Sequence, residues 1–114
     1  MKVKIHEKYD AVVVELKGNI MGSDETKEFH STVRKLLEEE KKNIVVDLGE
    51  VKFMNSTGLG MLISGYTTIK NGGGAMVICN TTEKIESLLV ITKLITIFDN
   101  FNSVDEAVES FKKK

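Results

Sequence analysis

Apolar and polar positions repeat with two different periods along the chain, and these periods divide it into strands and helices. Val3 and Ile5 alternate with polar neighbours over residues 2–6, which indicates a half-buried strand. The next run, Ala11–Leu16, is rich in β-branched residues and follows after a short connection, so the two strands are predicted to form an antiparallel hairpin. Gly18 is expected to end the second strand.

Two longer segments repeat their apolar residues with the period of a helix. The first predicted helix runs from Glu25 to Glu40, after a loop over residues 19–24. Ser23 or Asp24 can cap its first turn, because both side chains accept hydrogen bonds from free helix amides. The second predicted helix runs over 57–70. Its apolar face consists of Leu59, Leu62, Ile63, Tyr66 and Ile69.

Two apolar runs have too few polar residues for one-sided strands. Ile44–Leu48 and Ala75–Cys79 are therefore predicted to be central strands that are covered on both faces. The glycine run Gly72–Gly74 lies between a helix and a strand, where it is expected to end the helix. A third helix is predicted from Glu83 to Val90, with its cap among residues 80–82, and Ile95–Phe98 is predicted to be a short last strand.

The chain closes with a predicted helix that Ser103 caps, and Glu106 three residues later completes a capping-box pattern. The basic end, Lys112–Lys114, suits the negative end of that helix. Strands and helices thus follow the order β-β-α-β-α-β-α-β-α. This order predicts an α/β fold, one domain over residues 1–114, with a mostly parallel mixed β-sheet, an N-terminal antiparallel hairpin and about four helices.

The composition is that of an ordinary soluble globular domain. Of 114 residues, 41% are hydrophobic and 29% are charged, and the net charge of -1 does not indicate a protein that binds nucleic acid directly. Cys79 is the single cysteine and is expected to be a buried, unreactive thiol. The start of the chain is charged where a signal peptide is apolar, and there is no membrane-spanning run, so a cytoplasmic protein is expected.

The patterns of catalytic, metal and nucleotide sites are sparse. His6 and His30 have no histidine or cysteine partner at a spacing typical of metal ligands. The glycine run at residues 72–74 follows a helix, whereas a phosphate loop opens one. Ser56 is not in a Gly-x-Ser-x-Gly motif, although its strand-turn-helix setting leaves a serine hydrolase as one alternative. No cofactor and no metal are expected.

The segment over residues 53–60 joins a buried strand to a helix and carries two adjacent hydroxyls. In open α/β sheets, ligands bind at the carboxyl ends of the strands, and free helix amides favour anions. We therefore interpret this joint as a protein-binding surface with a hydroxyl that can be phosphorylated. The alternative is that Asn55, Ser56 or Thr57 only caps the helix.

The stretch Val45–Gly60 resembles the central motif of the STAS domain, and is most similar to that of bacterial anti-sigma factor antagonists. In these proteins a strand ending in Asp-Leu leads into an aromatic-Met-Asp-Ser-Ser/Thr-Gly-Leu-Gly turn. Gly18, the glycines at 72 and 73, and the segment Ile91–Leu94 extend the resemblance over nearly the whole chain.

This resemblance implies a partner-switching regulator that is not an enzyme. Such proteins bind an anti-sigma factor, which is often a serine kinase of the histidine-kinase-like ATPase type, and thereby release a sigma factor. The kinase phosphorylates the hydroxyl that corresponds to Ser56, with Thr57 as a less favoured acceptor, and a phosphatase reverses the reaction. The expected partner-binding residues are Asn19, Met21, Gly22, Ser23, Asn55, Ser56, Thr57, Gly58, Leu59 and Met61.

The chain departs from the family pattern at two places. The aspartate of the motif is Asn55, which can still cap the helix, and the usual Glu-Leu-Asp after Gly18 is Asn19-Ile20-Met21. These differences leave open a STAS module that binds its partner without phosphorylation, or one that senses a nucleotide at the same helix end.

Overall fold

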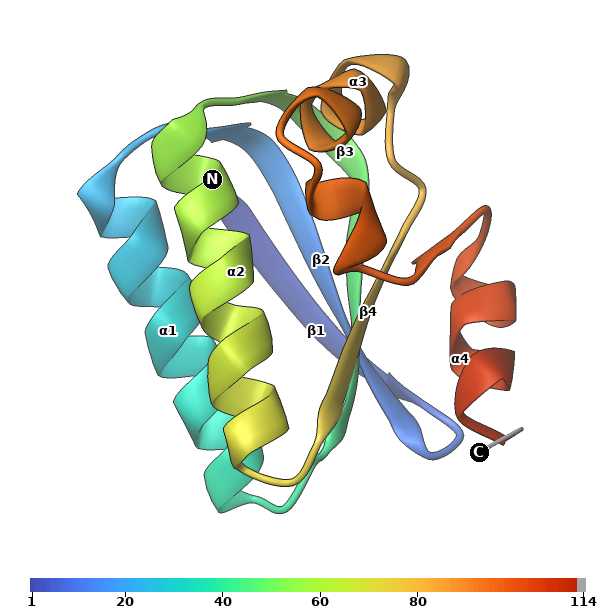
Figure 1. The fold of residues 1–114 in the computed structure, drawn as a ribbon. Coiled ribbons are helices and arrows are strands. Elements are labelled where there is room, and N and C mark those ends of the chain that lie inside the picture. The colour runs from blue at the N-terminus through green and yellow to red at the C-terminus, as the bar shows by residue number, and fades with distance from the viewer. Residues whose placement is uncertain (113–114) are drawn as a thin grey trace.

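The computed structural model describes residues 1–112, in which a five-stranded sheet is combined with four α-helices (Figure 1). The strands are β1 (Lys2–Lys8), β2 (Ala11–Ile20), β3 (Asn43–Met54), β4 (Ala75–Cys79) and β5 (Asn100–Phe101). The helices are α1 (Ser23–Glu38), α2 (Ser56–Asn71), α3 (Glu83–Ile91) and α4 (Val104–Lys112), with a 3-10 turn at Leu94–Thr96.

The strands lie in the order β1-β2-β3-β4-β5 across the sheet. β1 is antiparallel to β2, and every other neighbouring pair is parallel. Helices α1 and α2 cover one face of the sheet, and α4 covers the other (Figure 1). The predicted α/β class, the antiparallel hairpin and the mostly parallel sheet are thus confirmed.

The alternation of side chains along the central strands divides the core between these two layers. Val12 and Val14 belong to the larger cluster, which also contains the apolar faces of α1 and α2. Val13 points the other way, into a smaller cluster with Val45 and the α4 residue Val108. Residues buried on both faces explain why the central strands read as continuous apolar runs.

The second strand does not end at Gly18, contrary to the prediction. Gly18 has φ of +98°, and the β2–β3 register shifts on either side of it, between Glu15 and Lys17 and between Gly18 and Asn19. A glycine can adopt this backbone conformation without strain, so it forms an irregularity within the strand. Pairing with β3 then continues to Ile20, and the loop begins only at Met21.

The expected side-chain cap of α1 is also wrong. The helix begins at Ser23, after the N-cap residue Gly22, and no side chain caps it. Thr26 instead donates its backbone N–H to the Gly22 carbonyl at 3.4 Å. Ile5, expected on a half-buried strand, is 49% exposed because β1 lies at the edge of the sheet.

Residues 95–98 do not form the predicted last strand. Lys93 has a left-handed backbone with φ of 64°, which ends α3 and leads into the 3-10 turn. Phe98 is buried and packs edge-on against Tyr66, with 5.5 Å between the ring centroids. Of this run only Phe98 is buried in the core, whereas Ile97 is 41% exposed, and β5 pairs with β4 only at Asn100 and Phe101.

The other helix signals correspond to the structure. Thr82 caps α3, accepting from the Ile85 N–H at 3.4 Å, and Ser103 accepts from the Glu106 N–H at 3.1 Å. Residues 113–114 of the expected basic end lie outside the described residues.

Candidate functional site at the start of helix α2

Asn55 connects the start of α2 to the end of β2. Its Oδ1 accepts a hydrogen bond from the Gly58 N–H at 3.1 Å and so caps the helix. Its Nδ2 donates to the Met21 carbonyl at 3.1 Å, and its backbone N–H donates to the Ile20 carbonyl at 3.4 Å. One side chain therefore positions both the first turn of α2 and the β2–α1 loop.

The two hydroxyl residues that follow Asn55 lie on the surface. Ser56 and Thr57 are exposed, and within the described chain their hydroxyls make no hydrogen bond. Their backbone N–H groups also find no acceptor among the described residues, since the Asn55 side chain satisfies Gly58 and the Asn55 carbonyl accepts from Leu59 at 3.0 Å. Two unsatisfied amides and the helix dipole favour an anion at this position.

Three of the ten residues expected on the partner surface lie in the core instead. Leu59 and Met61 are only 5% and 1% exposed, and they pack in the larger hydrophobic cluster. Gly58 is buried because the helix start lies close to β2: a Cβ there would come within 2.6 Å of the Ile20 carbonyl oxygen. A partner cannot reach these side chains, so we omit them from the surface.

The structure adds Phe53 to this surface; the residue lies in the 53–60 joint but is not among the ten expected partner-binding residues. Phe53 pairs with Asn19 in the β2–β3 register, whereas the next pair, Ile20 and Met54, is buried in the core. Strand alternation turns Phe53 outward, where it is 44% exposed. The centroid of its ring lies 5.9 Å from Lys84 Nζ. Strand alternation could have placed it only with knowledge that the strand continues to Met54 and that Met54 faces inward, which the structure supplies.

The exposed part of the site combines apolar and polar groups. Met21 is 46% exposed beside the loop, and its N–H donates to Glu25 Oε1 at 3.5 Å. We define the joint surface as Asn19, Met21, Gly22, Ser23, Phe53, Asn55, Ser56 and Thr57. Such a mixture of exposed large apolar side chains and hydroxyls suits a protein partner.

The arrangement supplies no constellation for catalysis at Ser56. No hydrogen bond links the Ser56 hydroxyl to a histidine within the described residues, where His6 lies on β1 and His30 on α1. The described part of the chain also contains no group of three or more ligating side chains that could hold a metal. Burial raises the pKa of the Cys79 thiol to about 12, which makes it a poor nucleophile.

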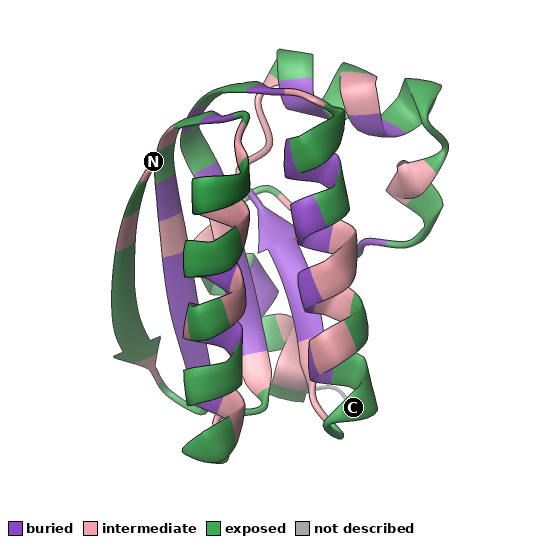
Figure 2. Cartoon of the chain, turned by 90° about the vertical axis from the view of Figure 1, so that its left-hand side faces the viewer, coloured by how far each residue is buried: buried purple, intermediate pink, exposed green. Residues whose placement is uncertain are grey.

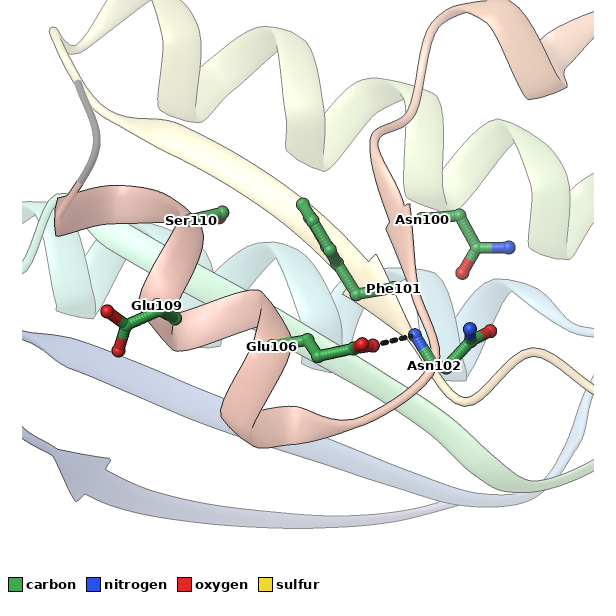
Figure 3. A pocket seen from close by; sticks show the side chains of 6 residues that line it. All are labelled: Asn100, Phe101, Asn102, Glu106, Glu109 and Ser110. Atoms are coloured by element: carbon green, nitrogen blue, oxygen red, sulfur yellow. Dashed lines mark hydrogen bonds between the residues drawn. The ribbon is translucent and has the colours of Figure 1, made fainter.

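A cavity of about 420 Å³ lies between β5 and α4, away from the joint surface (Figure 3). Two acidic side chains, Glu106 and Glu109, contribute to its lining. Glu106 Oε2 accepts a hydrogen bond from the Asn102 N–H at 3.1 Å, as Figure 3 shows. This carboxylate therefore serves the start of α4, and the cavity contains none of the predicted site residues.

None of the helices in the described chain is both long enough and apolar enough to cross a bilayer.

Comparison with known proteins identifies relatives of the whole fold. The STAS domain family matches residues 2–107. The anti-sigma F factor antagonist of Paenibacillus polymyxa is 34% identical over 62 residues, which are 52% of this chain and 53% of that protein. The chain therefore aligns with only about half the length of this relative.

Two solved structures show the same fold at low sequence identity. An anti-sigma factor antagonist from Mycobacterium paratuberculosis has a TM-score of 0.82 at 18% identity, with 96% of this chain and 92% of that chain covered. The Bacillus cell fate determinant SpoIIAA in its phosphorylated form has a TM-score of 0.73 at 13% identity, with 96% and 99% covered.

Proposed function

Because the chain belongs to the STAS domain family, we propose that it acts as an anti-sigma factor antagonist. It binds an anti-sigma factor that is also a serine kinase of the histidine-kinase-like ATPase type, and so releases a sigma factor. Relatives that carry the name anti-sigma factor antagonist support this proposal. This role requires no catalysis and no direct contact with nucleic acid. It implies a location in the cytoplasm, where sigma factors act. Residues 1–114 are treated as one STAS domain.

We further propose that phosphorylation of Ser56 switches this interaction off and that a phosphatase restores it. The observation that carries the proposal is the position of Ser56: its exposed hydroxyl lies at the first residue of a 16-residue helix. It is also adjacent to the capping residue whose side chain binds the Met21 carbonyl. A kinase can reach the hydroxyl, and a phosphate there would lie within the proposed partner surface.

The energetics of this position favour a switch in binding over a change in fold. A phosphate adds roughly -1.5 to -2 charges. At a helix N-terminus the dipole stabilises a negative charge by about 0.3–2 kcal/mol, so the domain tolerates the group. Burial of the same dianion against a partner without a counter-charge costs several kcal/mol. Since about 1.4 kcal/mol is tenfold in affinity, phosphorylation is expected to abolish binding while the fold stays intact.

The test uses the purified chain, ATP and a serine kinase of this type from the same genome. Mass spectrometry of the wild-type chain is expected to place one phosphate on Ser56. Ser56→Ala removes phosphate incorporation, whereas the matched variant Thr57→Ala retains it. Incorporation into Ser56→Ala at the wild-type rate would contradict the assignment.

The second arm of the test measures binding of the anti-sigma factor by titration calorimetry. Ser56→Asp is expected to weaken binding at least tenfold, and Ser56→Ala is expected to bind like the wild-type chain. Circular dichroism melts of both variants act as the control for folding. Unchanged binding by Ser56→Asp would remove the switch but not the antagonist role.

One observation favours a second candidate, a STAS module that binds its partner without phosphorylation. The residue before Ser56 is Asn55. Its side-chain oxygen accepts a hydrogen bond from the Gly58 N–H, and its side-chain nitrogen donates one to the Met21 carbonyl. It therefore offers a kinase no carboxylate next to the acceptor. Binding of the anti-sigma factor without phosphate incorporation would support this candidate, and titration with ATP and GTP tests the related alternative of a nucleotide sensor.

A further inference from the structure

Strand β1 presents a free edge that is distant in sequence from the joint surface. β1 is the first strand in the sheet order and is paired only with β2, so its outer backbone groups have no strand partner in the described chain. It is seven residues long, whereas β5 at the opposite edge has two. Figure 2 shows β1 as a mostly exposed strand at the border of the sheet. An edge of this length can accept another strand.

The two faces of β1 have different chemistry. Lys2, Lys4, His6 and Lys8 all lie on the face that is shared with α4, where Lys8 forms an ion pair with the α4 residue Asp105. Within the described residues, Lys2 and Lys4 form no ion pair and are exposed. Across β2, Lys2 lies opposite Lys17 and Lys4 opposite Glu15, so the start of this face carries a net positive charge.

The opposite face of β1 carries Val3, Ile5 and Glu7; Glu7 forms an ion pair with Lys41, and the apolar part of the face borders a groove. Val3 and Ile5 pair with Leu16 and Val14, which belong to the core beneath α1 and α2. Ile5 is 49% exposed and lies in a groove of about 430 Å³ between β1 and α1. The groove is lined by Ile5, Ser31, Thr32, Lys35, Leu36 and Glu39. An apolar side chain of an added strand would fit above Ile5.

The positions of the basic residues argue against a second copy of this chain as the occupant. In a symmetric antiparallel pair, opposite residues share a face, so even positions of β1 always meet even positions. If Ile5 lies at the centre, Lys2 meets Lys8 and Lys4 meets His6. If Lys4 lies at the centre, it meets its own copy. If His6 lies at the centre, Lys4 meets Lys8. Like charges directly opposite are destabilising in every register.

We propose that β1 is a docking edge for an extended segment of another protein, in which acidic residues alternate with apolar ones. The segment adds a sixth strand to the sheet through main-chain hydrogen bonds. Its acidic side chains face Lys2 and Lys4, and its apolar side chains cover Ile5 and the groove against α1. Lysines on an edge also discourage unselective pairing, so the experiment must separate this role from docking.

The probe is the capped peptide Glu-Val-Glu-Ile-Glu-Val-Glu, and its matched control carries lysine in place of every glutamate. Nuclear magnetic resonance of the full chain is expected to show shifts in β1 and in the groove residues of α1 with the acidic peptide. Every second amide of β1 should gain protection from hydrogen exchange, since only alternate amides face outward. A peptide methylated at alternate backbone nitrogens is expected not to bind, because it cannot complete the ladder.

Charge reversal on the protein supplies the second arm. The double variant Lys2→Glu and Lys4→Glu is expected to bind the acidic peptide at least about tenfold more weakly than the wild-type chain does. The matched double variant Lys27→Glu and Lys70→Glu, with the same net charge, retains the affinity. Equal binding of the lysine peptide or of the methylated peptide would overturn the proposal, as would no binding of the acidic peptide. A dimer that the Lys2 and Lys4 reversal dissociates would overturn it in favour of a second copy.

Discussion

The side chain of Asn55 donates a hydrogen bond from Nδ2 to the backbone carbonyl of Met21, at 3.1 Å. The same side chain caps α2 through its Oδ1. An aspartate, which the family pattern has here, can keep the cap but cannot donate to the carbonyl. The asparagine thus makes a contact between the helix start and the β2–α1 loop that the family's usual residue cannot make.

Replacement of Asn55 separates these two roles. Asn55→Ala loses the cap and the loop contact, and we expect it to lower the free energy of unfolding by about 2 kcal/mol. Asn55→Asp keeps the cap and adds a favourable charge at the helix N-terminus, so its stability is expected to stay within about 1 kcal/mol of the wild-type value. Urea unfolding of the two variants measures the difference, and equal losses would contradict the stabilising role of the cap, because only Asn55→Ala removes it.

Gly58 and Gly60 have opposite requirements, although both lie near the start of α2. A Cβ at Gly58 would lie 2.5 Å from Met54 Cγ and 2.6 Å from the Ile20 carbonyl oxygen, whereas nothing lies within 4 Å of one at Gly60. We expect Gly58→Ala to destabilise the fold by about 1–3 kcal/mol through overpacking. Gly60→Ala is expected to stabilise it by about 0.5–1 kcal/mol through helix propensity. Thermal unfolding compares the pair, and a loss at Gly60 would refute this account.

The buried thiol of Cys79 predicts a dependence of stability on alkaline pH. Burial, with a smaller contribution from the Asp47 carboxylate, raises the pKa of this thiol from 9.0 to about 12 in the folded state. Below pH 9 the thiol is protonated in both states, so its contribution is constant. Between pH 9 and 12 only the unfolded chain loses the proton, and stability falls by up to about 1.4 kcal/mol per pH unit.

Urea unfolding across this pH range measures the effect, and Cys79→Ala is the control. The variant starts less stable because it leaves a small cavity, but its decline between pH 9 and 12 is expected to be shallower. The native wild-type thiol should also resist alkylation at pH 8 and react after unfolding. Parallel pH profiles for the two proteins would show that other groups cause the decline.

The exposed side chains of Met21 and Phe53 are expected to anchor the anti-sigma factor, if the proposed function holds. Because more than half of each residue is buried, truncation to alanine is expected to lower the free energy of unfolding by about 1 kcal/mol, which leaves the domain folded. Each variant is expected to weaken binding by about tenfold, as truncation of an apolar anchor typically does. Titration calorimetry provides the measurement. Tyr9→Ala, an exposed aromatic at the β1–β2 turn, should bind like the wild-type chain.

Much of the candidate site can be located from the sequence. The strand-to-helix joint, the hydroxyls at 56 and 57 and the loop that carries Met21 are all identified from local patterns, and the structure brings them together through Asn55. Phe53 was missed because the face of a residue near the end of a strand depends on where the strand ends. Leu59 and Met61 entered the expected surface through the family resemblance, although Leu59 also lay on the predicted apolar face of the helix, and the structure buries both.

The sequence by itself determined the order of strands and helices, because the spacing of apolar residues and the capping residues act over a few positions. It also placed the start of α2 within one residue, whereas the structure shows that Asn55, among the three candidate caps, accepts from the Gly58 amide. Only the tertiary structure decided how far β2 and β3 extend, since Ile20 and Met54 remain in strands by pairing with each other. It likewise decided that Phe98 packs into the core against Tyr66 and that β1 stays at an open edge, because both depend on partners distant along the chain.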